Sequence, residues 1–152
     1  MKVLIIIPAY NEQENIINTV SKVLDYKTEC DFQLDYVVIN DGSKDNTYDI
    51  CRKNNIRCVN LIQNLGIGGA VQTGYKLANM QDYDIAVQFD GDGQHDINSL
   101  KSLIAPIVNG TADFTVGSRF IGDGVSFQST AMRRFGIKIL SFTLKLFAKV
   151  NI

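Results

Sequence analysis

Short apolar runs that alternate with amphipathic stretches are the feature of this chain that most constrains its fold. Each run is continuous and rich in β-branched residues, which is typical of strands covered on both faces. The expected strands are residues 3–7, 36–39, 58–62, 85–89 and 114–116. Because helical patterns separate them, the sequence predicts an α/β fold with a mostly parallel sheet and helices on both faces.

The helical stretches are recognised by the spacing of their apolar side chains. The two clearest stripes are Ile16, Ile17, Val20, Val23 and Leu24, and Leu100, Leu103, Ile104, Ile107 and Val108. This spacing predicts one buried face for each helix. Weaker patterns at residues 45–53 and 69–79 predict two further helices.

Length and composition limit the possible domain organisation. With 152 residues, 45% of them apolar, the chain can bury a core of ordinary size. We expect one domain over residues 1–134, followed by a basic amphipathic helix over residues 135–152. A net charge of −1 argues against nucleic acid binding through bulk charge.

Cysteine usage and the start of the sequence indicate a compartment. Cys30, Cys51 and Cys58 are an odd number without a CxxC pair, which argues against a disulfide framework or a zinc site and favours free thiols in a reducing compartment. Pro8 directly follows the opening apolar run, and polar residues stand where a signal peptide would be cleaved. We therefore expect a cytoplasmic protein.

Polar clusters follow the first four expected strands, at residues 9–12, 40–43, 64–69 and 90–95. The carboxyl ends of parallel strands share one edge of the sheet, where α/β folds bind their ligands. In the last cluster, Asp90 and Asp92 offer hard oxygen ligands for Mg²⁺ or Mn²⁺, an ion that completes its shell with water and substrate phosphates. The clusters predict a site for a metal-bound phosphorylated ligand.

The residues at particular positions of the Asp90 cluster argue against two other kinds of site. A calcium loop is excluded because His95 occupies the sixth position, where glycine is needed, and Lys101 the twelfth, where glutamate belongs. An aspartyl phosphatase motif is disfavoured by Gln94. His95 fits three roles equally: metal ligand, hydrogen-bond partner of a diphosphate, or helix cap.

The other clusters also have competing interpretations. Residues 41–43 are equally typical of a turn that caps the following helix. The glycines at 66, 68 and 69 follow the third strand rather than the first, which disfavours a dinucleotide fingerprint, and Tyr75 breaks the Gly-Lys pair of a phosphate loop. Backbone amides at the start of that helix can still face an anion.

Five motifs in this order resemble the signatures of family 2 glycosyltransferases, and are most similar to the dolichyl-phosphate mannose synthase and polyprenyl-phosphate glycosyltransferase branch. They are Ile7-Pro8-Ala9-Tyr10-Asn11-Glu12, Asn40-Asp41-Gly42-Ser43-Lys44-Asp45-Asn46-Thr47, Asn64-Leu65-Gly66-Ile67-Gly68-Gly69-Ala70, Asp90-Gly91-Asp92-Gly93-Gln94-His95 and Gly117-Ser118-Arg119. The resemblance implies a GT-A, Rossmann-like nucleotide-diphospho-sugar transferase fold and inversion at the anomeric carbon.

The resemblance also implies roles for individual residues. Those placed around the nucleotide are Pro8, Ala9, Tyr10, Glu12, Asp41, Gly68, Asp90 and Gly91. Asp92 and Gln94, with Asp90, would hold a Mg²⁺ or Mn²⁺ that bridges the diphosphate, and Asp92 would be catalytic. A divalent ion that neutralises the leaving diphosphate makes a separate proton donor unnecessary.

The residues after the last motif concern the acceptor. In the polyprenyl-phosphate branch, arginines at places similar to Arg119, Arg133 and Arg134 bind the lipid phosphate, and Arg119 and Arg133 would act in catalysis. Guanidinium groups suit this task, although solvated surface charges are the competing interpretation. A phosphate acceptor is already ionised, whereas a sugar hydroxyl would need a carboxylate base, and none follows Asp123. This favours a lipid phosphate.

The expected helix at residues 135–152 has lysines on one stripe and phenylalanines and leucines over most of the rest. Such a helix suits a membrane interface, which predicts a location peripheral to the cytoplasmic face of the membrane. Packing on the sheet or against further sequence explains the pattern nearly as well. The lysines exclude a spanning segment.

Several departures from the family leave alternatives. Asn40 stands where an acidic residue is common, tryptophan is absent, and the sequence ends where relatives continue. A nucleotide-sugar-binding domain without turnover is therefore the main alternative, beside transfer to a saccharide hydroxyl in cell-envelope polysaccharide synthesis. A nucleotidyltransferase is less favoured, because residues 8–12 replace its glycine-rich basic loop. The sugar, the choice of UDP or GDP, and the oligomeric state do not follow from the sequence.

Overall fold

A computed structural model describes residues 1–91 and 95–117 of the chain. The chain divides into two compact units, Met1–Thr115 and Val116–Ile152. All described elements belong to the first unit: β1 (Lys2–Ala9), α1 (Ile16–Lys27), β2 (Gln33–Asn40), α2 (Thr47–Lys53), β3 (Cys58–Asn60), α3 (Gly66–Met80), β4 (Ile85–Gln88), the 3₁₀ turn η1 (Ile97–Ser99) and α4 (Leu100–Val108).

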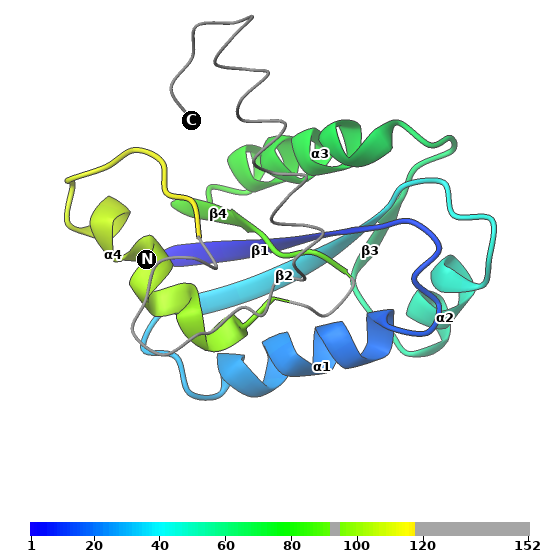
Figure 1. Cartoon of the computed structure of the whole chain (residues 1–152), viewed down its shortest axis with the longest axis horizontal. Helices are drawn as coiled ribbons and strands as arrows, with labels where there is room; N and C mark the ends of the chain where they lie inside the picture. The colour runs from blue at the N-terminus through cyan, green and yellow to red at the C-terminus, as the bar shows by residue number, and fades with distance from the viewer. Residues whose placement is uncertain (92–94, 118–152) are drawn as a thin grey trace, which may run out of the picture. The chain divides into compact units, whose positions relative to one another are not determined.

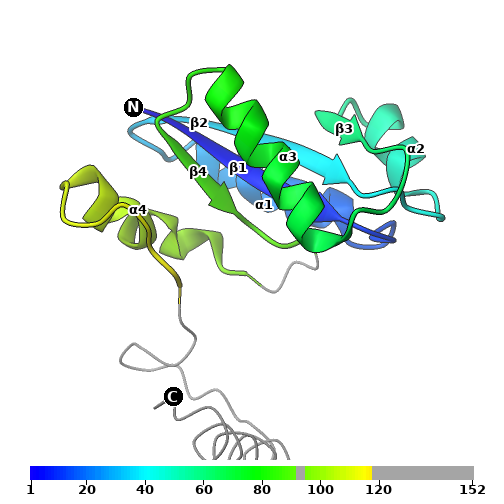
Figure 2. The ribbon, with the colours of Figure 1, turned by 90° about the horizontal axis from the view of Figure 1, so that it is seen from above.

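The strands form one parallel sheet in the order β3-β2-β1-β4 (Figures 1 and 2). The central strand β1 pairs with β2 along its whole length, from Lys2 opposite Gln33 to Ala9 opposite Asn40. Since all four strands run the same way, their carboxyl ends share one edge. The predicted parallel α/β fold is confirmed.

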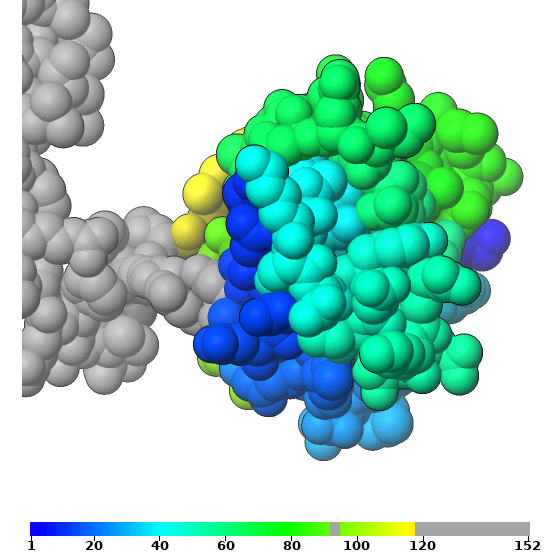
Figure 3. All heavy atoms as spheres, turned by 90° about the vertical axis from the view of Figure 1, so that its right-hand side faces the viewer, coloured from blue at the N-terminus to red at the C-terminus, as the bar shows by residue number. Residues whose placement is uncertain are grey.

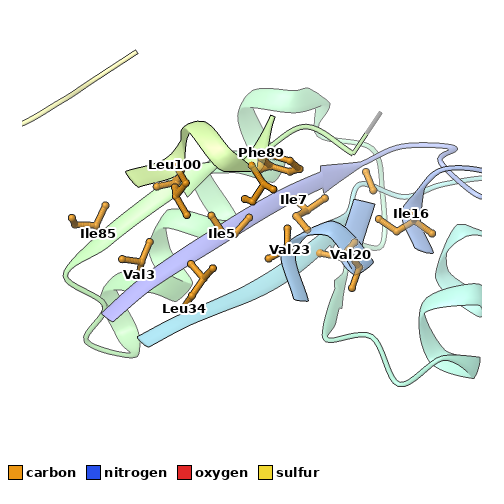
Figure 4. Packing of buried hydrophobic residues seen from close by; sticks show 14 of the residues in the cluster. Val3, Ile5, Ile7, Ile16, Val20, Val23, Leu34, Ile85, Phe89 and Leu100 are labelled. Carbon is orange, nitrogen blue, oxygen red and sulfur yellow. The ribbon is translucent and has the colours of Figure 1, made fainter. Parts of the chain in front are cut away.

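Helices cover both faces of the sheet because successive side chains of β1 point to opposite sides. Val3, Ile5 and Ile7 pack with α1, η1 and α4 on one face, as Figure 4 shows, while Leu4 and Ile6 pack under α3 on the other. Residues 3–7 are all fully buried, in agreement with the continuous apolar run. Figure 1 shows α1 and α3 on opposite sides of the sheet.

The apolar stripe of α1 is narrower than its spacing predicts. Ile16, Val20 and Val23 are buried, but Ile17 and Leu24 are more than 40% exposed. The polar Thr19 is fully buried on this face instead. On α4, Val108 likewise lies exposed, whereas Leu100 and Ile104 are in the core. The sheet therefore covers only one side of the apolar stripe on α1, and the apolar residues on the other side of the stripe remain exposed.

The predicted strand at residues 114–116 is wrong. These residues form no strand, and Phe114 and Val116 are each 75% exposed. The third strand also ends at Asn60 rather than at residue 62, and Ile62 is fully exposed. Local β propensity does not make a strand without a neighbour to pair with. The predicted helix at 135–152 lies outside the described residues.

Two further findings concern the cysteines and the membrane. All three cysteines are free thiols, with Cys51 buried and Cys30 and Cys58 half-buried. Within residues 1–91 and 95–117, no helix has the length and hydropathy required to cross a bilayer.

Candidate functional site

The carboxyl edge of the sheet brings the predicted nucleotide residues together. Pro8 and Ala9 end β1, Asp41 directly follows β2, and Asp90 and Gly91 follow β4. Figure 3 views this edge, with the β1–α1 loop (residues 10–15, blue) beside the β2–α2 loop (residues 41–46, cyan). Five predicted site residues lie outside the described residues: Asp92, Gln94, Arg119, Arg133 and Arg134.

Hydrogen bonds join the β1–α1 loop to the β2–α2 loop. The Asn11 amide donates to Ser43 Oγ, and the Lys44 amide donates to Asn11 Oδ1, both at 2.9 Å. Asn11 adopts a positive φ of 59°, a conformation that asparagine tolerates better than most residues. These contacts fix the direction in which the chain leaves β1 after Ala9, next to the exposed Tyr10.

A second connection runs through Asp45 and Thr47. Asp45 accepts hydrogen bonds from the Thr47 amide and hydroxyl through Oδ1 and from the Gln13 amide through Oδ2. Thr47 Oγ1 in turn accepts from the Glu12 amide at 2.9 Å. Burial raises the pKa of the Asp45 carboxyl, but these donors outweigh burial and hold it below its usual value. The Glu12 backbone is thereby fixed in the β1–α1 loop, ahead of α1.

Asp41 connects β2 to the loop that follows β3. Its side chain is 3% exposed, and Oδ1 accepts from the Leu65 amide at 2.7 Å. Its own amide donates to the Ala9 carbonyl at 2.9 Å. The neighbouring Gly42 has a φ of +63°, and a Cβ there would lie 2.7 Å from the Asn64 nitrogen. The Asp41 side chain therefore forms a hydrogen bond with the β3–α3 loop. It does not cap α2, which was the competing interpretation of residues 41–43.

The departure at Asn40 has a structural reason. Asn40 is 1% exposed, and its Nδ2 donates to Asn60 Oδ1 on the neighbouring strand. Its Oδ1 accepts from Ser43 Oγ. An amide side chain can donate to Asn60 and accept from Ser43, whereas an ionised carboxylate could only accept hydrogen bonds. In this chain, the first residue of the second motif joins β2 to β3.

Asp90 lies just beyond β4, and both of its carboxylate oxygens contact described residues. Oδ1 accepts from Gln88 Nε2 at 2.9 Å, and Oδ2 is 3.3 Å from His95 Nε2. The His95 ring also meets the buried Phe89 edge to face, at 5.6 Å between centroids. Asp96, not His95, caps the following 3₁₀ turn. Of the three roles weighed for His95, the helix cap is therefore wrong.

Gly91 is packed tightly between the first loop and α1. A Cβ at this position would lie 2.9 Å from the Pro8 carbonyl oxygen and 3.5 Å from Glu12 Cγ. The Gly91 carbonyl accepts a buried hydrogen bond of 2.9 Å from Thr19 Oγ1. Glycine is thus needed here for close approach to β1.

The described part of the chain supplies a limited donor set for a metal ion. Asp90 offers hard carboxylate oxygen at the predicted place, and such oxygen suits Mg²⁺ or Mn²⁺. Within residues 1–91 and 95–117, no three His, Cys, Asp or Glu side chains are grouped as a complete site.

Several residues at this edge escaped prediction. Asp45 and Thr47 belong to the second motif, at residues 40–47, but the sequence alone indicates no role for them. Thr19 carries only the weak signal of a polar residue on an apolar stripe. A surface pocket of about 400 Å³ is lined by Asn11, Gln13, Glu14, Asn15, Lys44 and Asp45. It lies beside the two joined loops and contains none of the predicted nucleotide residues.

Proteins similar to this chain include polyprenyl-phosphate sugar transferases. It is 32% identical over 161 residues to a UDP-N-acetylglucosamine–dolichyl-phosphate N-acetylglucosaminyltransferase from Methanococcus voltae, covering 92% of this chain and 62% of that protein. It is 32% identical over 129 residues to an undecaprenyl-phosphate mannosyltransferase from Micrococcus luteus, covering 82% and 51%. The chain thus spans between half and two thirds of the length of these relatives.

A solved structure shows the same fold. Glucosyl-3-phosphoglycerate synthase from Mycobacterium tuberculosis, in complex with Mn²⁺, UDP-glucose and phosphoglyceric acid, matches with a TM-score of 0.56 at 22% identity, covering 72% of this chain and 40% of that one. The likeness confirms the predicted GT-A fold. Residues 4–151 match the family described as Glycosyl transferase family 2. Because this match covers nearly the whole chain, the chain belongs to glycosyl transferase family 2, and its relatives are those of the polyprenyl-phosphate branch.

Proposed function

We propose that this chain contains the donor-binding domain of a metal-dependent, inverting glycosyltransferase that moves a sugar from a nucleoside-diphosphate sugar to a polyprenyl or dolichyl phosphate. The observation that carries the proposal is the convergence of Pro8, Asp41 and Asp90 at one edge of a parallel sheet in a family 2 chain. The names of the relatives, which act on dolichyl and undecaprenyl phosphates, support the acceptor class.

On this proposal, the first two loops hold the nucleoside. Pro8, Ala9, Tyr10 and Glu12 would surround the base and ribose, and Asp41 would contact the base. The hydrogen bonds between the two loops support this assignment, because they hold both sides of the site in fixed positions before a ligand arrives. Such preorganisation lowers the entropy cost of binding.

The diphosphate would lie beyond β4 and the start of α3. Asp90 and Gly91 would line it, Gly68 would present backbone to it at the helix N-terminus, and Asp90, Asp92 and Gln94 would hold Mg²⁺ or Mn²⁺. The bound ion would supply positive charge that stabilises the departing diphosphate. The Mn²⁺ and UDP-glucose present in the fold neighbour support this choice of cofactor and donor class.

The acceptor phosphate would be bound by Arg119, Arg133 and Arg134. An ionised phosphate is itself a nucleophile, so the protein must place it in line with the anomeric carbon and compensate its charge, and no general base is required. The basic stretch at residues 135–152 supports a position at the membrane surface, where such a lipid is reached.

Melting experiments with nucleoside diphosphates test the donor site. We expect UDP or GDP to raise the Tm of the chain in the presence of Mn²⁺, because a ligand that binds only the native state stabilises it. Asp92→Asn should leave the far-ultraviolet circular dichroism and the unliganded Tm unchanged but abolish the Mn²⁺-dependent shift. Asp25→Asn is the matched control, because Asp25 is an exposed carboxylate on α1. No shift with either diphosphate at saturating Mn²⁺ would contradict the proposal.

Transfer assays test the acceptor. With a radiolabelled donor, we expect sugar to be transferred to a short-chain polyprenyl phosphate and not to the corresponding polyprenol. Transfer to a saccharide instead would contradict a lipid-phosphate acceptor while leaving the donor site in place. Diphosphate binding without transfer to any acceptor would identify the chain as a binding domain without turnover.

A further inference from the structure

Thr19 is a polar side chain in an otherwise apolar contact between α1 and the sheet. It is fully buried, between Ile16 and Val20 along the helix, both of which are in the core. Threonine is a poor helix former compared with alanine or leucine, so neither burial nor helix propensity explains it at this position. A buried hydroxyl is expected to have a specific hydrogen-bond partner.

The partner of this hydroxyl is distant in the sequence. Thr19 Oγ1 donates to the Gly91 carbonyl at 2.9 Å, across 72 residues of chain. A threonine hydroxyl in a helix more often donates to the backbone carbonyl four residues earlier in the same helix. Thr73 Oγ1 does so in α3, where it donates to the Gly69 carbonyl at 2.8 Å. The Thr19 hydroxyl therefore serves the segment after β4 rather than α1.

The Gly91 peptide has little freedom apart from this contact. Its α carbon lies against the end of β1, since an added Cβ would be 2.9 Å from the Pro8 carbonyl oxygen. Without the Thr19 hydroxyl, the buried Gly91 carbonyl would lose this hydrogen bond, and replacing it would require the peptide to rotate or to admit water. Rotation would move the backbone that directly follows Asp90, and entry of water would loosen the contact of this backbone with α1.

We propose that Thr19 is a positioning residue for the diphosphate and metal site, holding the Gly91 peptide and with it the Asp90 carboxylate at the carboxyl edge of the sheet. The inference rests on the proposed function for the identity of the ligand. It predicts that affinity for a nucleoside diphosphate in the presence of Mn²⁺ depends on a hydroxyl that does not itself touch the ligand.

Three variants separate positioning from simple stabilisation. Thr19→Val keeps the shape of the side chain but removes the donor, Thr19→Ser restores the donor, and Thr73→Val is the matched control in α3. With UDP and GDP as probes and MnCl₂ present, we expect Thr19→Val to weaken calorimetric binding about tenfold at a temperature well below its Tm, equivalent to about 1.4 kcal/mol. Thr19→Ser should recover most of the affinity, and Thr73→Val should bind like the unchanged chain.

A ligand-free measurement distinguishes failure of this inference from failure of the proposed function. Amide hydrogen exchange in the segment around residues 88–91 should become faster in Thr19→Val than in Thr73→Val. If the unchanged chain binds neither diphosphate, the proposed function fails, and exchange alone decides whether Thr19 holds this segment. Unaltered exchange, or a lowered Tm with unaltered affinity, would overturn the positioning role. If Thr19→Val does not fold, Thr19→Ala carries the same test.

Discussion

Single side chains at the carboxyl edge of this sheet connect segments that are distant in sequence. Asp41 accepts a hydrogen bond from the Leu65 amide, and Asn40 donates one to Asn60, so the second motif joins β2 to β3 and to the loop that follows β3. Because these groups are almost fully buried, each must find a partner of the right donor or acceptor type. The hydrogen-bond partner therefore limits which residue types can occupy such positions.

The hydrogen bond between the Asn40 and Asn60 side chains leads to a prediction about a single residue. Asn40→Asp would place a carboxylate opposite the side-chain oxygen Oδ1 of Asn60 and next to Asp41. We expect this substitution to lower the free energy of unfolding by about 1–3 kcal/mol at neutral pH. Urea denaturation measures this change. Asn18→Asp, on the exposed face of α1, is the control and should have little effect. Equal stability of the two variants would show that the Asn40–Asn60 bond contributes little.

At the scale of elements, α3 approaches the sheet closely through one glycine. A Cβ at Gly74 would lie 2.3 Å from Ile6 Cγ2, and Ile6 is fully buried in β1. At Gly68, near the start of the same helix, an added Cβ would meet nothing within 4 Å. Two glycines in one helix therefore differ in purpose: the first leaves space open near the proposed diphosphate site, and the second permits packing.

The same substitution at these two positions should have opposite effects. Gly74→Ala overpacks the contact with β1 and should lower the free energy of unfolding by about 1–3 kcal/mol. Gly68→Ala should raise it by about 0.5–1 kcal/mol, because alanine loses less backbone entropy in a helix. Urea midpoints of the two variants measure both changes. A stabilised Gly74→Ala would mean that α3 can move away from the sheet without cost.

At the scale of the whole molecule, a polar network lies in the part of the sheet away from the site. Asp35 on β2 accepts hydrogen bonds from Lys27 of α1 at 2.8 Å, from Gln33 at 3.0 Å and from Tyr83 before β4 at 3.1 Å. Burial raises the pKa of Asp35, but these donors outweigh burial and keep it below its usual value. This one carboxylate joins segments from both halves of the first unit.

This network predicts how stability depends on pH. Since the native pKa of Asp35 lies below that of the unfolded chain, its contribution is present above about pH 4 and is lost as the pH falls through the native pKa. We expect the urea midpoint to fall on acidification from pH 7 to pH 3, and to fall less in Asp35→Asn. Asp25→Asn is the control and should follow the unchanged chain. If the urea midpoint depends on pH in the same way in the unchanged chain and in both variants, Asp35 does not contribute to the loss of stability in acid.

The sequence by itself determined the strand and helix alternation, the parallel sheet and the four polar loops at one edge. These follow from local information, because side-chain periodicity and the direction of parallel strands need no knowledge of distant partners. The false strand at 114–116 shows the limit, since a strand exists only where a neighbour pairs with it.

Only the tertiary structure decided which groups meet at that edge. The contacts of Thr19 with Gly91, Asp41 with Leu65 and Asn40 with Asn60 join separate elements, and nothing in their local spacing indicates them. The exposure of Ile17 and Leu24 was decided in the same way, by how much of α1 the sheet can cover. The periodicity of apolar side chains determines which face of each helix or strand is buried. The order of the strands and the close packing of the loops determine which residues that face contacts.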